Sequence, residues 1–86
     1  MRTSTDKPSE AAQNIYARVA YAKSSQTEII SMLADNYFNM ADSYDDMLQA
    51  CEYALWIRDF ATVQRLSNML KKIYPEYIAE LDKKVS

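Results

Sequence analysis

Apolar residues recur through the first half of the chain at intervals built from threes and fours. After Ala11 they fall at Ile15, Val19, Ala22, Ile29, Leu33 and Met40. This spacing places them on one face of an α-helix. No stretch alternates apolar and polar residues with the period of two that is expected of a strand. The pattern therefore predicts helix over residues 9–41, as one long helix or as two.

A local signal favours two helices. The string Ser25-Gln-Thr-Glu28 has the form of a capping box, which starts a new helix and predicts a break near Ser24–Ser25. An unbroken helix would instead extend about 50 Å, at roughly 1.5 Å per residue. So long a helix in a chain of 86 residues would favour a coiled-coil homodimer through Ala11–Ala41.

The next helix is predicted to begin at Ser43, because this hydroxyl lies three residues before the acid Asp46. It should end near Ile57-Arg58. The positions expected to face the core are Tyr44, Met47 or Leu48, Cys51, Ala54 and Leu55.

Asp59 is a suitable N-cap for a further helix. Its apolar stripe consists of Phe60, Val63, Leu66, Leu70 and Ile73. Pro75 should interrupt it, because the residue before a proline avoids the α region. A short last helix would then turn Tyr77 or Ile78, Leu81 and Val85 inward.

The predicted fold class is therefore all-α. Four to five short amphipathic helices should pack as antiparallel hairpins, either as a small bundle or in a repeat-like arrangement. Residues 1–8 are polar after the first methionine and are expected to be a disordered leader. Residues 9–86 are then expected to form one helical domain.

Residues 33–55 resemble a tetratricopeptide repeat. The matching positions are Leu33-Ala34, the aromatic pair Tyr37-Phe38, the turn Ala41-Asp42 with Tyr44, and Ala54-Leu55 near the end of the second helix. The pattern departs from the family at Ser43, which is inserted in the turn, and at Met47, which replaces a small alanine. Size and pattern together resemble small chaperones of bacterial secretion systems.

The resemblance implies an adaptor that holds a helix of a partner protein. Repeat units cannot bury their faces alone, and about three are needed for independent stability. This chain has room for at most two helical pairs and a tail. The resemblance therefore implies that a partner helix or a second copy covers the remaining face.

The amino-acid composition excludes several kinds of functional site. The chain has no glycine, no histidine and one cysteine, which excludes glycine-rich phosphate loops, Cys/His zinc sites and Cys–His nucleophile pairs. Cys51 lies on a predicted core stripe with Met47 and Leu55. We therefore expect no enzyme activity, no cofactor and no small-molecule substrate. Residues 1–10 lack a signal-peptide pattern, no apolar run could span a membrane, and the expected location is cytoplasmic.

Charge is unevenly distributed, although the net charge is only -2. Residues 24–57 carry six acids and no Lys or Arg. Asp42, Asp45 and Asp46 could suggest a metal site, but calcium loops need a glycine for their sharp turn, and helix starts attract acids anyway. The acidic middle also argues against nucleic-acid binding, which requires a dense basic face.

The acidic segment is also rich in aromatic side chains, which favour protein interfaces. We expect a protein partner to meet apolar Tyr37, Phe38, Tyr44 and Trp56, with its Lys or Arg side chains near Asp42, Asp45 and Asp46. Two alternatives remain open at this point. The protein could be a structural homodimer through the long helical segment, or a small regulator whose acids mask a basic surface of another protein.

Overall fold

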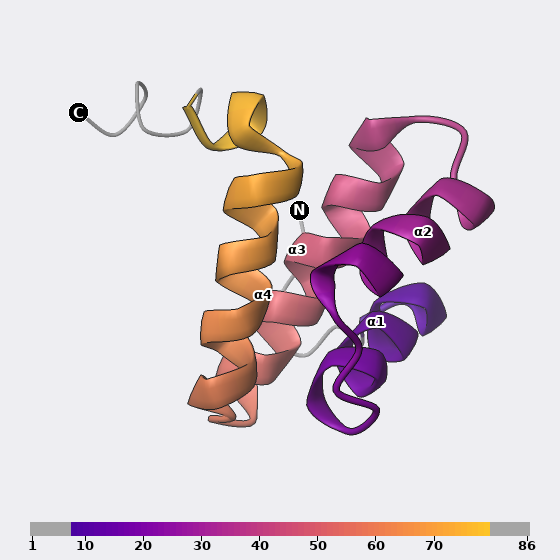
Figure 1. Ribbon diagram of the computed structural model, residues 1–86. Coiled ribbons are helices and arrows are strands. Elements are labelled where there is room, and N and C mark those ends of the chain that lie inside the picture. The colour runs from indigo at the N-terminus through magenta and orange to yellow at the C-terminus, as the bar shows by residue number, and fades with distance from the viewer. Residues whose placement is uncertain (1–7, 80–86) are drawn as a thin grey trace.

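The structure is a computed structural model that describes residues 8–79 (Figure 1). Its four main helices are α1 Glu10–Ala20, α2 Gln26–Asn36, α3 Met40–Trp56 and α4 Phe60–Ile73. A further helical turn covers residues 75–79. No strand occurs in this described range. The predicted all-α fold of four to five short helices is confirmed.

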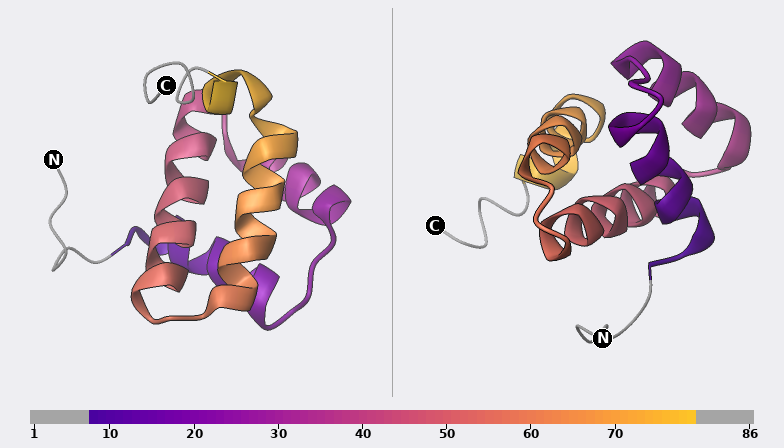
Figure 2. Two further views of the ribbon diagram at one scale, coloured as in Figure 1. Left: turned by 90° about the vertical axis from the view of Figure 1, so that its left-hand side faces the viewer. Right: turned by 90° about the horizontal axis from the view of Figure 1, so that it is seen from below.

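Helices α3 and α4 form an antiparallel hairpin, and α1 runs across one face of it (Figure 2). Helix α2 precedes α3 and contributes Ile29 and Leu33 to the core. The α1–α2 link and the α3–α4 turn are at the lower end of the molecule in Figure 1, whereas the α2–α3 link and the end of α4 are at the upper end. These two ends carry the surfaces described below.

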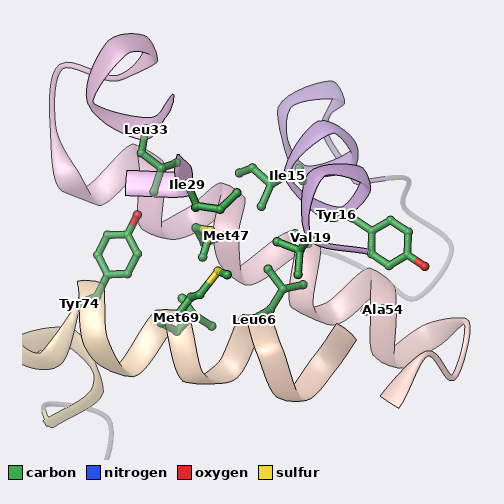
Figure 3. Close-up of a cluster of buried hydrophobic side chains, with 13 residues drawn as sticks. Ile15, Tyr16, Val19, Ile29, Leu33, Met47, Ala54, Leu66, Met69 and Tyr74 are labelled. Carbon is green, nitrogen blue, oxygen red and sulfur yellow. The ribbon is translucent and has the colours of Figure 1, made fainter. Parts of the chain in front are cut away.

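All four helices contribute to one apolar core (Figure 3). Its buried side chains are Ala12, Ile15, Tyr16, Val19, Ile29, Leu33, Met47, Ala50, Ala54, Leu66, Met69, Leu70 and Tyr74. Helix α3 turns small residues, Ala50 and Ala54, toward its neighbours. Small side chains let helix backbones approach closely, which allows α3 to pack against both α1 and α4.

The predicted break near Ser24–Ser25 is confirmed, and so is its capping box. The Ser25 hydroxyl accepts from the Glu28 N–H, and the Glu28 carboxylate accepts from the Ser25 N–H. A continuous helix over Ala11–Ala41 is therefore absent. Apolar residues on both sides of the break, such as Ile15 and Ile29, are buried in the protein's own core. The face needed for the long-helix homodimer is already used.

The predicted start of the third helix is wrong. Helix α3 begins at Met40, and Asn39 is its N-cap, with the Asn39 side chain accepting from the Asp42 N–H. Ser43 is buried within α3, where its hydroxyl donates to the Met40 carbonyl oxygen. The turn between α2 and α3 thus lies at residues 37–39, ahead of the Ala41–Tyr44 stretch where the repeat pattern placed it.

The end of α3 and both boundaries of α4 agree with the prediction. Helix α3 ends at Trp56, and the Asp59 carboxylate caps α4 by accepting from the Thr62 N–H. Helix α4 ends before Pro75, and Tyr77 and Ile78 are half-buried against the core. The positions predicted to face the core that are instead exposed are Ala22, Met40, Leu55 and Phe60.

Two expectations fall on residues outside the described range. The predicted disordered leader covers residues 1–8, of which only Pro8 lies in the described range. The predicted inward positions Leu81 and Val85 lie beyond residue 79. Within residues 8–79, no helix is both long enough and apolar enough to cross a membrane.

The end of α4 is joined to α3 by a buried hydrogen-bond chain. The Tyr74 hydroxyl donates to the Ser43 Oγ at 2.7 Å, and that hydroxyl in turn donates to the Met40 carbonyl. Burial raises the pKa of the Tyr74 hydroxyl above its ordinary value.

Ser43→Ala should destabilise the fold more than Tyr74→Phe. Ser43→Ala leaves the buried Tyr74 hydroxyl without its acceptor, which should lower the free energy of unfolding by about 2 kcal/mol. Tyr74→Phe removes only a donor, which should lower it by about 1 kcal/mol. The double variant should cost clearly less than the sum of the two, because the orphaned hydroxyl is then gone. Urea unfolding of the four proteins measures this, with Tyr77→Phe as a control. Additive effects would show that the two hydroxyls are not coupled.

The hydrogen bonds of Asp59 predict how the stability of the fold changes at low pH. The hydrogen bond from the Tyr16 hydroxyl, and then those from Thr62, lower the pKa of the Asp59 carboxyl. Their stabilising contribution is present above the unfolded pKa of about 3.9 and is lost as the pH falls through the lower, folded value. The Tm difference between wild type and Asp59→Asn should therefore shrink below about pH 4. A difference that stays constant from pH 6 to pH 2 would contradict this.

Candidate functional site

An apolar groove of about 210 Å³ opens at the upper end of the molecule, where α2, the α2–α3 link and the end of α4 meet. We call it the groove. Its walls include Ile30, Leu33, Phe38, Met40, Ile73 and Tyr74. The floor is formed by the buried side chains Leu33 and Tyr74, whereas Ile30, Phe38 and Met40 are exposed.

The backbone of the α2–α3 link explains why Phe38 is exposed. Tyr37 ends α2 in an extended conformation, with φ -132° and ψ 139°. Successive side chains of an extended backbone point to opposite sides. Tyr37 turns inward to Asp46, and Phe38 consequently points outward and is completely exposed. The inward anchor thus presents Phe38 at the mouth of the groove.

Asp46 joins three segments of the protein. Its carboxylate accepts from the Tyr37 hydroxyl at 2.5 Å and from the Ser9 hydroxyl at 2.9 Å. The Ser9 N–H also donates to the Gln49 side chain on α3. Burial, and next the hydrogen bond to Asp46, raise the pKa of Tyr37, which keeps this hydroxyl protonated as a donor. Asp46 therefore fixes the start of α1 and the end of α2 on α3.

Tyr44 packs in an aromatic cluster near the start of α3. Its ring lies 5.2 Å from that of Tyr74 and 4.6 Å from that of Tyr77, measured between centroids. Edge and tilted arrangements at these distances are favourable for aromatic rings. The half-buried Tyr44 is thus engaged with the end of α4 and offers a partner only part of its ring.

Asp42 and Asp45 are exposed on the first turns of α3. Asp42 accepts from the Asn39 side chain, and Asp45 accepts from the Gln49 side chain. Both carboxylates stay accessible from solvent near the α2–α3 link. They are the two acids of the predicted set that could meet cations of a partner, because Asp46 is turned to Tyr37 and Ser9.

Trp56 does not share this surface. It ends α3, whose 17 residues make a helix of about 25 Å, so it lies at the lower end of the molecule. Trp56 is exposed there together with Tyr21, Leu55, Ile57 and Phe60. We call these five residues the tip. The predicted partner-binding residues are therefore divided between two ends of the protein.

Sequence reasoning overlooked part of the groove. Ile30 was assigned to no surface, whereas Met40 and Ile73 were both placed on apolar stripes expected to face the core. Ile30 carried a usable signal, because it directly follows the buried Ile29 and two successive residues cannot both face one side of a helix. The contribution of Ile73 depends on where the end of α4 lies in the folded protein, and no local sequence pattern predicts that position.

The remaining polar and cysteine side chains near these surfaces have structural roles or form no metal-binding group. Among residues 8–79, no group of three or more acidic or cysteine side chains is arranged to hold a metal ion. Cys51 is half-buried between α3 and α4, with its sulfur 3.6 Å from the Ser67 hydroxyl. Asn39 and Ser43 line the groove, but both act as structural groups at the start of α3.

Comparison with known proteins gives no match: no family model, no curated protein and no solved structure corresponds to this chain. The resemblance to tetratricopeptide repeats therefore stays a prediction from the sequence. The function has to be argued from the surfaces themselves.

Tyr37→Phe should loosen α2 more than the rest of the fold. Helix α2 buries only Ile29 and Leu33, so its anchor to Asp46 carries much of its attachment. We expect about fivefold faster amide exchange in α2, which corresponds to about 1 kcal/mol for one hydrogen bond.

Hydrogen exchange followed by NMR measures this effect, with α4 amides as the internal reference. Tyr44→Phe is the matched control, because its ring contacts remain. Equal acceleration in α2 and α4 would show that the Tyr37 anchor has no local role.

Proposed function

We propose that this protein is a small cytoplasmic protein–protein interaction module that acts as a chaperone or adaptor. The groove is the binding site, and its occupant is an amphipathic helix of a partner protein. The observation that carries the proposal is Phe38, which is completely exposed at the mouth of an apolar groove. Burying such a ring contributes about 1.5–3 kcal/mol.

The shape and lining of the groove favour a helix as the ligand. The apolar lining residues come from α2, the α2–α3 link, α3 and α4, namely Ile30, Leu33, Phe38, Met40 and Ile73. An amphipathic helix inserts apolar side chains at helical spacing into a groove of this type. Met40 adds an adaptable wall, because methionine adjusts its rotamers to different ligands.

The α4 side of the groove ends in the exposed cations Lys71 and Lys72, so the charge on its α2 and α3 side sets the chemistry of the partner there. Residues 24–57, which include α2, the link and α3, contain no Lys or Arg. Asp35 is exposed near the end of α2, and Asp42 and Asp45 are exposed at the start of α3. The partner helix should therefore carry Lys or Arg beside its apolar stripe. Such charges increase association rate and specificity more than affinity.

Masking of a basic surface remains the second candidate. Two exposed acids, Asp42 and Asp45, support it, and the internal position of Asp46 weakens it. Asp42→Lys together with Asp45→Lys separates the two functions. A masking regulator would lose binding entirely. A groove binder should keep its apolar contacts and weaken by about 30-fold or less, since exposed charge pairs contribute about 0–1 kcal/mol each and two pairs are removed.

Affinity capture from the native cell tests the groove directly. The wild-type chain should retain a specific protein that Phe38→Ser releases, with about a tenfold or greater loss of affinity in the reconstituted pair. Trp56→Ser is the matched control, because it also removes an exposed aromatic ring, but at the opposite end. The proposal fails if no protein is retained, or if Phe38→Ser and Trp56→Ser weaken binding equally.

A further inference from the structure

The volume of the groove limits how much of a partner can enter it. At about 210 Å³ the groove is larger than the roughly 150 Å³ that holds one benzene molecule in an apolar protein cavity. The difference leaves room for the methylene group that joins a ring to its backbone, but not for a second ring. The groove therefore takes one large apolar side chain. Other apolar side chains of a bound helix would lie over the exposed rim, at Ile30 and Phe38.

Aromatic rings and a thioether form much of the lining. Tyr37 at the end of α2, Phe38 in the α2–α3 link and Tyr74 at the end of α4 contribute the rings. Met40, the first residue of α3, contributes the thioether. Pairs of aromatic rings are favourable beyond the area that they bury, and so are contacts between a methionine sulfur and a ring. These walls favour an aromatic ring over an aliphatic side chain of similar size.

The hydroxyl groups that line the groove already donate hydrogen bonds within the protein. The Tyr37 hydroxyl donates to the Asp46 carboxylate. The Tyr74 hydroxyl donates to Ser43, whose own hydroxyl donates to the Met40 carbonyl oxygen. Among the lining residues that belong to the described range, these three are the ones with hydroxyls. A ligand hydroxyl buried against them would lose water without gaining a donor, which is unfavourable.

Asn39 is the remaining polar side chain among the described lining residues, and it is also engaged. Its amide oxygen accepts from the Asp42 N–H, and its amide nitrogen donates to the Asp42 carboxylate. Asn39 is exposed, whereas Ser43 and Tyr74 are buried. The inner part of the groove therefore behaves as an apolar site, although several of its lining residues are polar.

We propose that the groove recognises a phenylalanine side chain, which anchors the partner helix. The helix belongs to the function proposed above, on which this inference rests, whereas the preference for an unsubstituted ring follows from the lining alone. A phenyl ring fits the volume, contacts the aromatic walls and brings no polar atom. Tyrosine would add a hydroxyl that finds no donor, and leucine would lack the ring.

Toluene and p-cresol test this preference without knowledge of the partner, because they are the side chains of phenylalanine and tyrosine without the backbone. The ¹⁵N-labelled full-length protein is titrated with each compound and followed by NMR. Toluene should shift the amide signals of groove residues such as Leu33 and Ile73. We expect p-cresol to bind about fivefold or more weakly, because its hydroxyl is left without a donor. Cyclopentane, a saturated ring, should bind about threefold or more weakly than toluene.

Phe38→Leu replaces one aromatic wall by an aliphatic side chain. Phe38 is completely exposed, so the exchange should leave the fold intact. It should weaken toluene binding about threefold and leave cyclopentane binding unchanged. Phe60→Leu is the matched control, because it makes the same exchange at an exposed phenylalanine outside the groove. Circular dichroism of both variants verifies that the helices are retained.

The proposal is overturned if toluene shifts no groove signal, or if p-cresol or cyclopentane binds as tightly as toluene. It is also overturned if the groove signals shift with protein concentration before any compound is added, because a second copy would then occupy the groove. A captured partner together with absent toluene binding would reject the phenylalanine anchor and retain the proposed function. Toluene binding without any captured protein would reject the proposed function and retain the preference of the groove for a phenyl ring.

Discussion

Three tyrosine hydroxyls determine how the helices of this protein are placed on α3. Tyr16 reaches from α1 to Asp59 after the end of α3, Tyr37 reaches from the end of α2 to Asp46, and Tyr74 reaches from the end of α4 to Ser43. Apolar packing alone would allow the helices to slide or rotate, because it is non-directional. A hydroxyl with one acceptor at a fixed place removes that freedom.

The same contacts separate the two surfaces of the molecule. Tyr37 and Tyr74 organise the end that bears the groove, and Tyr16 organises the end that bears the tip. Exposed apolar side chains result at both ends because the chain reverses direction there, and neighbouring residues of a reversal cannot all face the core.

Local signals were sufficient for much of the fold. The capping box at Ser25 and the cap at Asp59 had no competing candidate nearby, and both starts were predicted correctly. The start of α3 was predicted at Ser43, because its hydroxyl lies three residues before Asp46. Asn39 is the cap, and the Ser43 hydroxyl is occupied by Tyr74, which is 31 residues away in the sequence. Such a contact has no local pattern.

The candidate site was predicted only in part for the same reason. Aromatic enrichment drew attention to Phe38 and Trp56, and both are exposed. The sequence alone did not separate residues with inward partners, Tyr37 and Asp46, from the outward Phe38, because the three share one segment. That distinction depends on the extended backbone at Tyr37 and on the hydrogen bond from the distant Ser9 hydroxyl to Asp46.

Because tyrosine hydroxyls hold the helices in place, the fold should lose stability at high pH. Burial, together with the nearby carboxylates of Asp59 and Asp46, raises the pKa of Tyr16 and Tyr37. The stability that they contribute is complete below the unfolded tyrosine pKa of about 10 and declines as the pH rises beyond it. Each ionised hydroxyl would then face a carboxylate as a like charge. Alkali should therefore release α1 and α2 from α3, and the absorbance of tyrosinate would record that release as it occurs.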